Sequence, residues 1–183
     1  MEMILIRHGE PDYSPCEKRG FIGQGHDLAP LTPQGVAQAR AVAESPLPEG
    51  AELLVSSPYT RAMQTASEIS RVTGLAIQVE LDLRELATDL KFRCRTREEV
   101  RRLHQEFMDC HGEYPPGETR RWETVSQLSA RVLPVLQKYL AYSKIIVVTH
   151  GGVIRRFVPQ GKILYCHPYP IQVTEPVTCH GWV

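Results

Sequence analysis

Long hydrophobic runs, net charge and cysteine pairs are all missing from this sequence of 183 residues. No apolar stretch approaches the roughly 20 residues that a membrane span needs, and the first ten residues lack the apolar core of a secretory signal. The 21 basic residues are matched by 21 acidic ones, which argues against a general binder of nucleic acids or anionic membranes. We therefore expect a cytoplasmic protein with no nucleic-acid and no membrane partner.

The cysteines are too few and too scattered to form a disulfide framework. There are five, an odd number, and no C-x-x-C motif occurs, so reduced thiols are expected. Three of them directly precede a histidine, at Cys110, Cys166 and Cys179. Adjacent ligands do not match the usual spacing of zinc sites, and we predict no metal site.

Hydrophobic residues make up 42% of the chain, enough for one well-packed domain over residues 1–183. Short apolar runs without alternation predict strands that are covered on both faces; they occupy residues 3–6, 52–56, 77–79 and 144–149. Helical patterns fall between them. This order predicts an α/β fold of three layers, α/β/α, with a mostly parallel central sheet. Residues 171–174 suggest a further strand at the edge.

Helix starts are marked by capping residues; these are Thr-Pro at 32–33, Ser-Pro at 57–58 and Thr-x-x-Glu at 96–99. The first helix should stop near Ser45, and Gly74 should end the second. A fourth apolar stripe runs from Val125 to Tyr139 and contains Pro134. We expect a kink or break there, because proline removes a helical hydrogen bond.

The segment 83–122 reads as a small helical and loop insertion over one edge of the sheet, where substrate specificity usually lies. Between residues 91 and 102 it carries more basic than acidic residues; the basic ones are Lys91, Arg93, Arg95, Arg97, Arg101 and Arg102. Two interpretations stay open. The cluster is either a solvated face or a basic rim that selects substrates with more than one anionic group.

Three predicted strands end in polar residues of the same kind. The first runs into Arg7 and His8, the second is followed by Arg61 in the next helix, and the fourth runs into His150. In a parallel sheet these ends lie at one edge, where open α/β proteins bind ligands. Helix N-termini at that edge also favour anions. The pattern predicts a phosphate pocket with an imidazole in it.

Five blocks of sequence resemble the histidine phosphatase superfamily, also called phosphoglycerate mutase-like. They are R-H-G-E at 7–10, P-L-T-P-Q-G-V-A-Q-A at 30–39, S-S-P-Y-T-R-A-M-Q-T-A at 56–66, L-R-E at 83–85 and V-T-H-G-G-V-I-R at 148–155. R-H-G alone is weak evidence. The blocks occur in the family's order and cover most of the chain up to about Arg156.

The resemblance implies roles for the site residues. His8 would attack phosphorus and carry a phosphohistidine. The phosphoryl oxygens would be held by Arg7, Arg61 and His150. Glu85 would act as general acid and then as general base. Gly9 would leave room for the phosphoryl group, and Gly25 lies in a loop that approaches the substrate in the family. No metal and no other cofactor is implied.

The sequence departs from the family pattern at several positions. Pro11 and Ser14 stand where the family often has threonine and asparagine, which leaves Ser14 as a substitute phosphate contact. The run after Glu85 is unusual, so Asp89 is the alternative acid. The family's Gly-Glu-Ser block aligns either with residues 117–119 or, at better spacing from Arg131, with residues 122–124.

We expect a metal-independent phosphatase that hydrolyses a small phosphomonoester, a phosphorylated metabolite, through phospho-His8. A phosphoglycerate mutase shares the first half-reaction and is the nearest alternative. Only residues 151–183 follow His150, whereas mutases of the family tend to be longer, which favours the phosphatase. A non-catalytic phosphate-binding or interaction module is the third hypothesis, and a homodimer is left open.

Overall fold

The computed structural model describes residues 1–159 and 161–180. Within them, the chain forms a five-stranded sheet in the order β3-β2-β4-β1-β5. The strands are β1 (Glu2–Arg7), β2 (Leu53–Ser56), β3 (Ile77–Val79), β4 (Lys144–Thr149) and β5 (Pro168–Gln172). All neighbours pair in parallel except β5, which is antiparallel to β1. The predicted mostly parallel sheet is confirmed.

The predicted edge strand exists, but it begins three residues earlier than expected. It lies at Pro168–Gln172 rather than at residues 171–174. Pro168 and Pro170 hide it in the sequence, since proline lacks an N–H group and is rare inside a sheet. An edge strand pairs on one side only, and Pro170 lies opposite Ile4 of β1 without a second neighbour.

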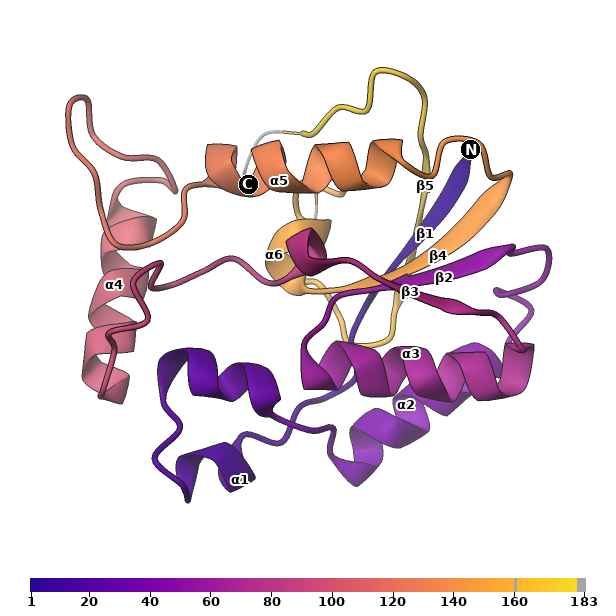
Figure 1. Cartoon of the computed structure of the whole chain (residues 1–183), viewed down its shortest axis with the longest axis horizontal. Helices are drawn as coiled ribbons and strands as arrows, with labels where there is room; N and C mark the ends of the chain where they lie inside the picture. The colour runs from indigo at the N-terminus through magenta and orange to yellow at the C-terminus, as the bar shows by residue number, and fades with distance from the viewer. Residues whose placement is uncertain (160, 181–183) are drawn as a thin grey trace.

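Helices cover both faces of the sheet (Figure 1). On one face lie α2 (Pro33–Ala43) and α3 (Thr60–Thr73), and on the other α5 (Val125–Gln137) and α6 (Gly151–Ile154). The short α1 (Ser14–Glu17) and α4 (Arg97–Asp109) lie beyond the end of the sheet, with 3₁₀ turns η1 (Gly23–Leu28) and η2 (Leu81–Leu83) completing the chain. The predicted three-layer α/β/α architecture is confirmed.

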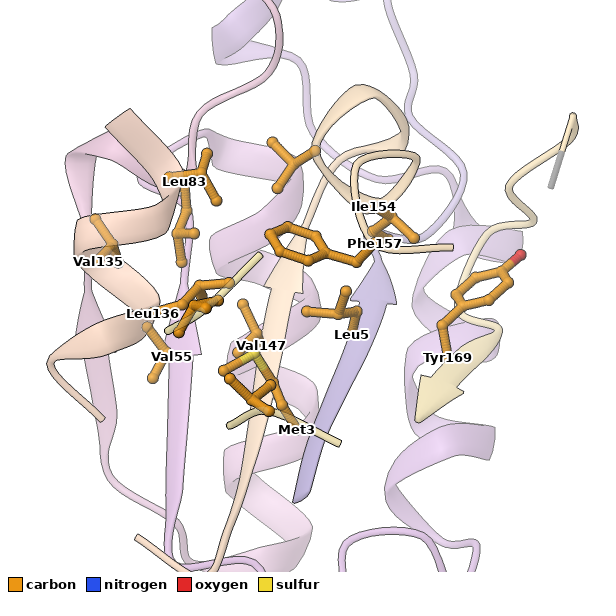
Figure 2. Close-up of a cluster of buried hydrophobic side chains, with 14 of the residues drawn as sticks. Met3, Leu5, Val55, Leu83, Val135, Leu136, Val147, Ile154, Phe157 and Tyr169 are labelled. Carbon is orange, nitrogen blue, oxygen red and sulfur yellow. The ribbon is translucent and has the colours of Figure 1, made fainter. Parts of the chain in front are cut away.

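The core consists of two layers, one on each face of the sheet. Alternate residues of β1 feed both, because successive strand side chains point to opposite faces. Met3 and Leu5 pack with α5, α6 and Phe157 (Figure 2). Ile4 and Ile6 pack against α2 and α3. This explains why the central strands are apolar at every position.

The helix boundaries follow the capping signals with two exceptions. Thr32 accepts a hydrogen bond from the N–H of Gly35 at 2.9 Å, and Thr96 and Glu99 form the predicted capping box. However, α3 begins at Thr60, two residues after the predicted Ser-Pro start. In addition, α5 continues through Pro134 to Gln137. The predicted break is wrong, since the helix continues for three residues past Pro134.

The insertion has a small apolar core of its own, in which Leu103 and Phe107 of α4 pack against Trp122. Its two ends run side by side, since the N–H of Leu90 bonds the Arg121 carbonyl at 2.6 Å and the N–H of Glu123 bonds the Ala87 carbonyl at 2.8 Å. Among the helices that the structure describes, none is long and apolar enough to cross a membrane.

Candidate active site

His8 lies where β1 ends and is only 2% exposed. Its Nδ1 is 2.7 Å from the Gly9 carbonyl oxygen, and its Nε2 is 3.1 Å from Nε of Arg61. A carbonyl only accepts, so the ring proton belongs on Nδ1 and Nε2 carries a lone pair. Burial, followed by the charges of Arg61 and Arg7, lowers the pKa of His8 to about 3 against the opposing Gly9 hydrogen bond. The ring is therefore neutral, with Nε2 available as a nucleophile.

Two arginines flank this imidazole. Arg61, in the first turn of α3, also donates from Nη1 to the His26 carbonyl at 3.1 Å. Arg7, at the end of β1, donates to the Ile163 carbonyl at 2.7 Å and packs 4.1 Å above the ring of Tyr165. Its Nε is buried and has no hydrogen-bond partner within the part of the chain that the structure describes.

His150 follows β4 and is fully buried. Its ring lies edge-on to that of His8, with centroids 5.1 Å apart, and its Nε2 is 2.7 Å from the Ser57 hydroxyl. Ser57 does not cap α3, because the helix begins at Thr60 and Tyr59 takes the cap position. Burial first, and then the charges of His8 and Arg61, hold the pKa of His150 well below its usual value. Its Nδ1 is buried without a partner among residues 1–159 and 161–180.

Glu85 is brought to the same edge from the start of the insertion. Its carboxylate accepts from the N–H of Gly152 at 3.1 and 3.3 Å, two residues after His150. A Cβ at position 152 would collide with Oε1 of Glu85, so any larger residue there would displace the carboxylate. The Glu85 carbonyl is also held, by Nη2 of Arg131 at 3.1 Å.

Asp89, the alternative acid, uses both carboxylate oxygens in hydrogen bonds within the insertion. It is 1% exposed, and its carboxylate accepts from the N–H groups of Lys91, Arg93 and Cys94 and from the Arg121 guanidinium. Burial alone would raise the pKa of Asp89, but these hydrogen bonds hold it well below its usual value. A carboxylate that resists protonation is a poor general acid, so the geometry favours Glu85.

Ser14 and Gly25 are not brought to this cluster. Ser14 is exposed at the start of α1, and its N–H bonds the Asp12 side chain at 2.9 Å. Gly25 lines a neighbouring hollow together with Phe21. Gly9 is constrained by the backbone itself, because a Cβ there would come within 2.5 Å of the Gly35 carbonyl oxygen. It allows the chain after β1 to cross the start of α2.

A cleft of about 420 Å³ leads inward to Arg61 and Glu85. Its walls include Asp27 and Tyr59, which the sequence analysis did not single out. Burial raises the pKa of Asp27 to about 6, partly offset by the charge of Arg61 and by a hydrogen bond from Tyr59. Asp27 is one of 21 acidic residues and follows no predicted strand, so no sequence signal distinguished it.

Arg131 ties the two ends of the insertion together. It pairs with Glu123, which is 2% exposed, at 2.6 Å, and donates to the carbonyls of Asp82 and Arg84 at 2.5 and 2.9 Å. Glu118, by contrast, is exposed. The family block therefore fits residues 122–124 rather than 117–119.

The basic cluster of residues 91–102 does not face the cleft. All six of its basic residues are exposed, and none is among the described residues that line the cleft. This arrangement is that of a solvated face. All five cysteines are free thiols, and no group of three or more His, Cys, Asp and Glu side chains in the described ranges is arranged to hold a metal ion.

Known proteins resemble this chain in sequence and fold. A Bacillus subtilis (strain 168) protein named "Uncharacterized phosphatase PhoE" is 31% identical over 161 residues, which is 86% of this chain and 76% of the relative. "Probable phosphoglycerate mutase GpmB" of Proteus mirabilis (strain HI4320) is 29% identical over 82% of this chain and 70% of its own length. The solved structure of Bacillus stearothermophilus YhfR superposes with a TM-score of 0.73 at 22% identity, over 100% of this chain and 95% of that one.

These relatives support an enzyme activity of the phosphatase or mutase kind. The family model described as "Histidine phosphatase superfamily (branch 1)" matches residues 3–161. That range contains His8, Arg61, Glu85 and His150 and all of the sheet except Glu2 and β5. The chain belongs to the histidine phosphatase superfamily.

Proposed function

We propose that the chain is a metal-independent phosphatase that hydrolyses a small phosphorylated metabolite through a phosphohistidine on His8. The observation that carries the proposal is the neutral His8, whose Nε2 lone pair faces Arg61 at 3.1 Å. A phosphoryl group that replaces this hydrogen bond meets the nucleophile Nε2 and, beside it, the guanidinium of Arg61.

In the first step, Nε2 of His8 forms a bond to phosphorus as the bond from phosphorus to the leaving oxygen breaks. Protonated Glu85 gives its proton to that oxygen, and the alcohol departs. In the second step, Glu85 takes a proton from water while the water oxygen attacks phosphorus and His8 leaves as neutral imidazole. General acid and base catalysis of this kind contributes roughly 10²–10⁴ in rate.

The remaining cluster residues suit the phosphoryl oxygens. Arg7 Nε and His150 Nδ1 are buried polar atoms without partners in the described residues, and buried groups of this kind normally have a partner. A Ser57 hydroxyl that donates to Nε2 of His150 leaves the proton on Nδ1, which then is a donor. Two guanidinium groups supply the positive charge that a metal ion provides in other phosphoryl-transfer enzymes.

A mutase is the second candidate, supported by the relative named as a phosphoglycerate mutase. Both activities share the phospho-His8 step and differ in the acceptor, which is water for a phosphatase and a second phosphoglycerate for a mutase. Isomerisation of 3-phosphoglycerate with a bisphosphoglycerate primer at a rate above phosphate release would favour the mutase.

The proposal is tested by hydrolysis of p-nitrophenyl phosphate in excess EDTA, with the His8→Gln variant as control. We expect turnover in EDTA that the variant lacks. Absence of turnover by the wild type over a broad pH range would favour the non-catalytic module instead. A panel of metabolite phosphates then identifies the preferred substrate.

A further inference from the structure

We infer that the outer half of the cleft is a binding subsite for a neutral apolar or aromatic group, carried by the organic part of the phosphomonoester. This inference rests on the proposed phosphatase function and adds the substrate class. The subsite is formed by Leu86, Leu90, Phe92 and Val100, all from the insertion.

The subsite lies in the same cleft as two of the proposed catalytic and phosphate-binding residues, Glu85 and Arg61. Phe92 and Val100 line this cleft too. Arg61 is 5% exposed and contacts His8 at 3.1 Å, whereas Phe92 is 72% exposed, so the cleft runs from the neighbourhood of His8 outward to Phe92. A monoester whose phosphoryl group meets His8 therefore directs its leaving group past Glu85 and along the insertion. The group that contacts these apolar side chains is therefore the organic part of the substrate, which leaves as the alcohol.

The exposure of Phe92 is supported by the surrounding structure. It is 72% exposed and has a φ of 54°, in the left-handed region that bulky residues rarely adopt. Such strain persists where neighbouring structure enforces it, often at ligand-binding sites. Here Asp89 binds the N–H groups on either side, those of Lys91 and Arg93, at 3.0 and 2.6 Å. Arg121 in turn fixes Asp89, so the turn presents an aromatic ring to the cleft.

The charges along the cleft select against an anionic leaving group. Beside Arg61, the lining contains Arg84, and Asp82 already neutralises Arg84 at 2.6 Å. The carboxyl groups of Asp27 and Glu85 also face the cleft. A second carboxylate or phosphate on the substrate would meet these carboxyls without an unpaired cation among the described lining residues. A neutral apolar group meets no such cost and removes exposed apolar surface from water.

The first test measures kcat/KM for a series of n-alkyl phosphates from methyl to hexyl. Each methylene that contacts the subsite should raise kcat/KM roughly two- to four-fold. Hexyl phosphate has five more methylenes than methyl phosphate, so its kcat/KM should be higher by about 30-fold or more. 3-Phosphoglycerate, which adds a carboxylate, should rank below hexyl phosphate. A flat series, or preference for 3-phosphoglycerate, would overturn the inference.

The second test uses variants of the exposed ring and the ratio of the hexyl to the methyl rate. Phe92→Ala should lower that ratio about ten-fold, the loss expected for much of one buried aromatic side chain, and Phe92→Leu should restore most of it. Phe21→Ala is the matched control, because Phe21 is 44% exposed and lines only the neighbouring hollow. An equal drop in Phe21→Ala, or none in Phe92→Ala, would contradict the assignment.

The two proposals fail in different ways. Hydrolysis of every alkyl phosphate at similar rates keeps the phosphatase and rejects the subsite. If neither the alkyl phosphates nor p-nitrophenyl phosphate is hydrolysed, the phosphatase and, with it, the subsite are rejected, whereas hydrolysis of p-nitrophenyl phosphate alone rejects only the subsite.

Discussion

The strand-end cluster, which consists of His8, Arg61 and His150, and the insertion are held in place in different ways, although residues of both line one cleft. His8, Arg61 and His150 are held by the sheet and by backbone groups, and each is at most 5% exposed. The insertion carries Glu85 and the apolar walls, and two ion pairs with buried carboxylates fix it, Asp89–Arg121 and Glu123–Arg131. The difference teaches that the proposed site for the phosphoryl group is built by the sheet and its adjoining helices, whereas the proposed site for the leaving group lies in a segment that its own ion pairs hold in place.

The largest effect is expected from Arg61, on the sheet side of this comparison. Arg61→Ala removes the guanidinium beside His8 Nε2 and should reduce kcat/KM for p-nitrophenyl phosphate by roughly 10³–10⁵. Arg84→Ala is the matched control, since Arg84 lines the cleft but pairs with Asp82. It should lose less than about ten-fold, in keeping with the small value of a half-exposed pair. Comparable losses in both variants would remove the distinction between the two regions.

Glu85 should show the next largest effect, and one that depends on the substrate. Glu85→Gln should lower turnover of an alkyl phosphate by roughly 10²–10⁴. The nitrophenyl ester should lose far less, because its leaving group needs no proton. Steady-state rates on both esters measure the difference, and equal losses would count against the acid role.

The Glu123–Arg131 ion pair, which holds the insertion, is expected to contribute to the stability of the fold. Glu123→Gln leaves buried Arg131 without its counter-charge and should lower the free energy of unfolding by about 3 kcal/mol. Glu118→Gln breaks an exposed pair with Arg120 and should cost less than about 1 kcal/mol. Urea unfolding followed by circular dichroism compares the two. If Glu123→Gln is as stable as Glu118→Gln, the ion pair does not hold the insertion as we describe.

The smallest effect is an acid sensitivity of the strand-end cluster. The pKa of His8 is about 3 in the folded protein, against 6.5 for a free histidine. Above pH 6.5 His8 is neutral in both the folded and the unfolded chain, so its burial adds no pH dependence to the free energy of unfolding. Below pH 6.5 only the unfolded chain takes up the proton, so the free energy of unfolding falls as the pH drops towards 3. Between pH 7 and 5, His8→Gln should lose about 2 kcal/mol less than the wild type. Thermal melts at both pH values measure this, and parallel losses would mean that His8 is not buried as a neutral ring.

The sequence predicted the strand-end cluster far better than the insertion, and the reason is physical. His8, Arg61 and His150 follow apolar strands, and the parallel sheet brings strand ends together whatever the intervening chain does. The Glu123–Arg131 pair was indicated only by the resemblance, through the spacing of residues 122–124 from Arg131 on α5. Asp27 comes from a 3₁₀ turn, whose position depends on long-range polar contacts that leave no periodic signal. The same reason explains Ser14 and Gly25, which were assigned by resemblance alone and lie outside the cluster.

Gly9 is a further residue whose surroundings could not be predicted from the sequence. The pattern R-H-G indicated space for a ligand, whereas the close approach is between two backbones, at Gly9 and Gly35. The sequence showed that a side chain is excluded there, but only the fold shows what excludes it.

The central claim is that Nε2 of His8 receives the phosphoryl group. Rapid acid-free quenching during turnover of p-nitrophenyl phosphate, followed by mass spectrometry of the digested protein, tests it directly. We predict one phosphoryl group on the peptide that contains His8, stable to alkali, lost in acid and absent from His8→Gln. Sustained phosphate release by the His8→Gln variant, or a phosphoryl group on another residue, would contradict the account.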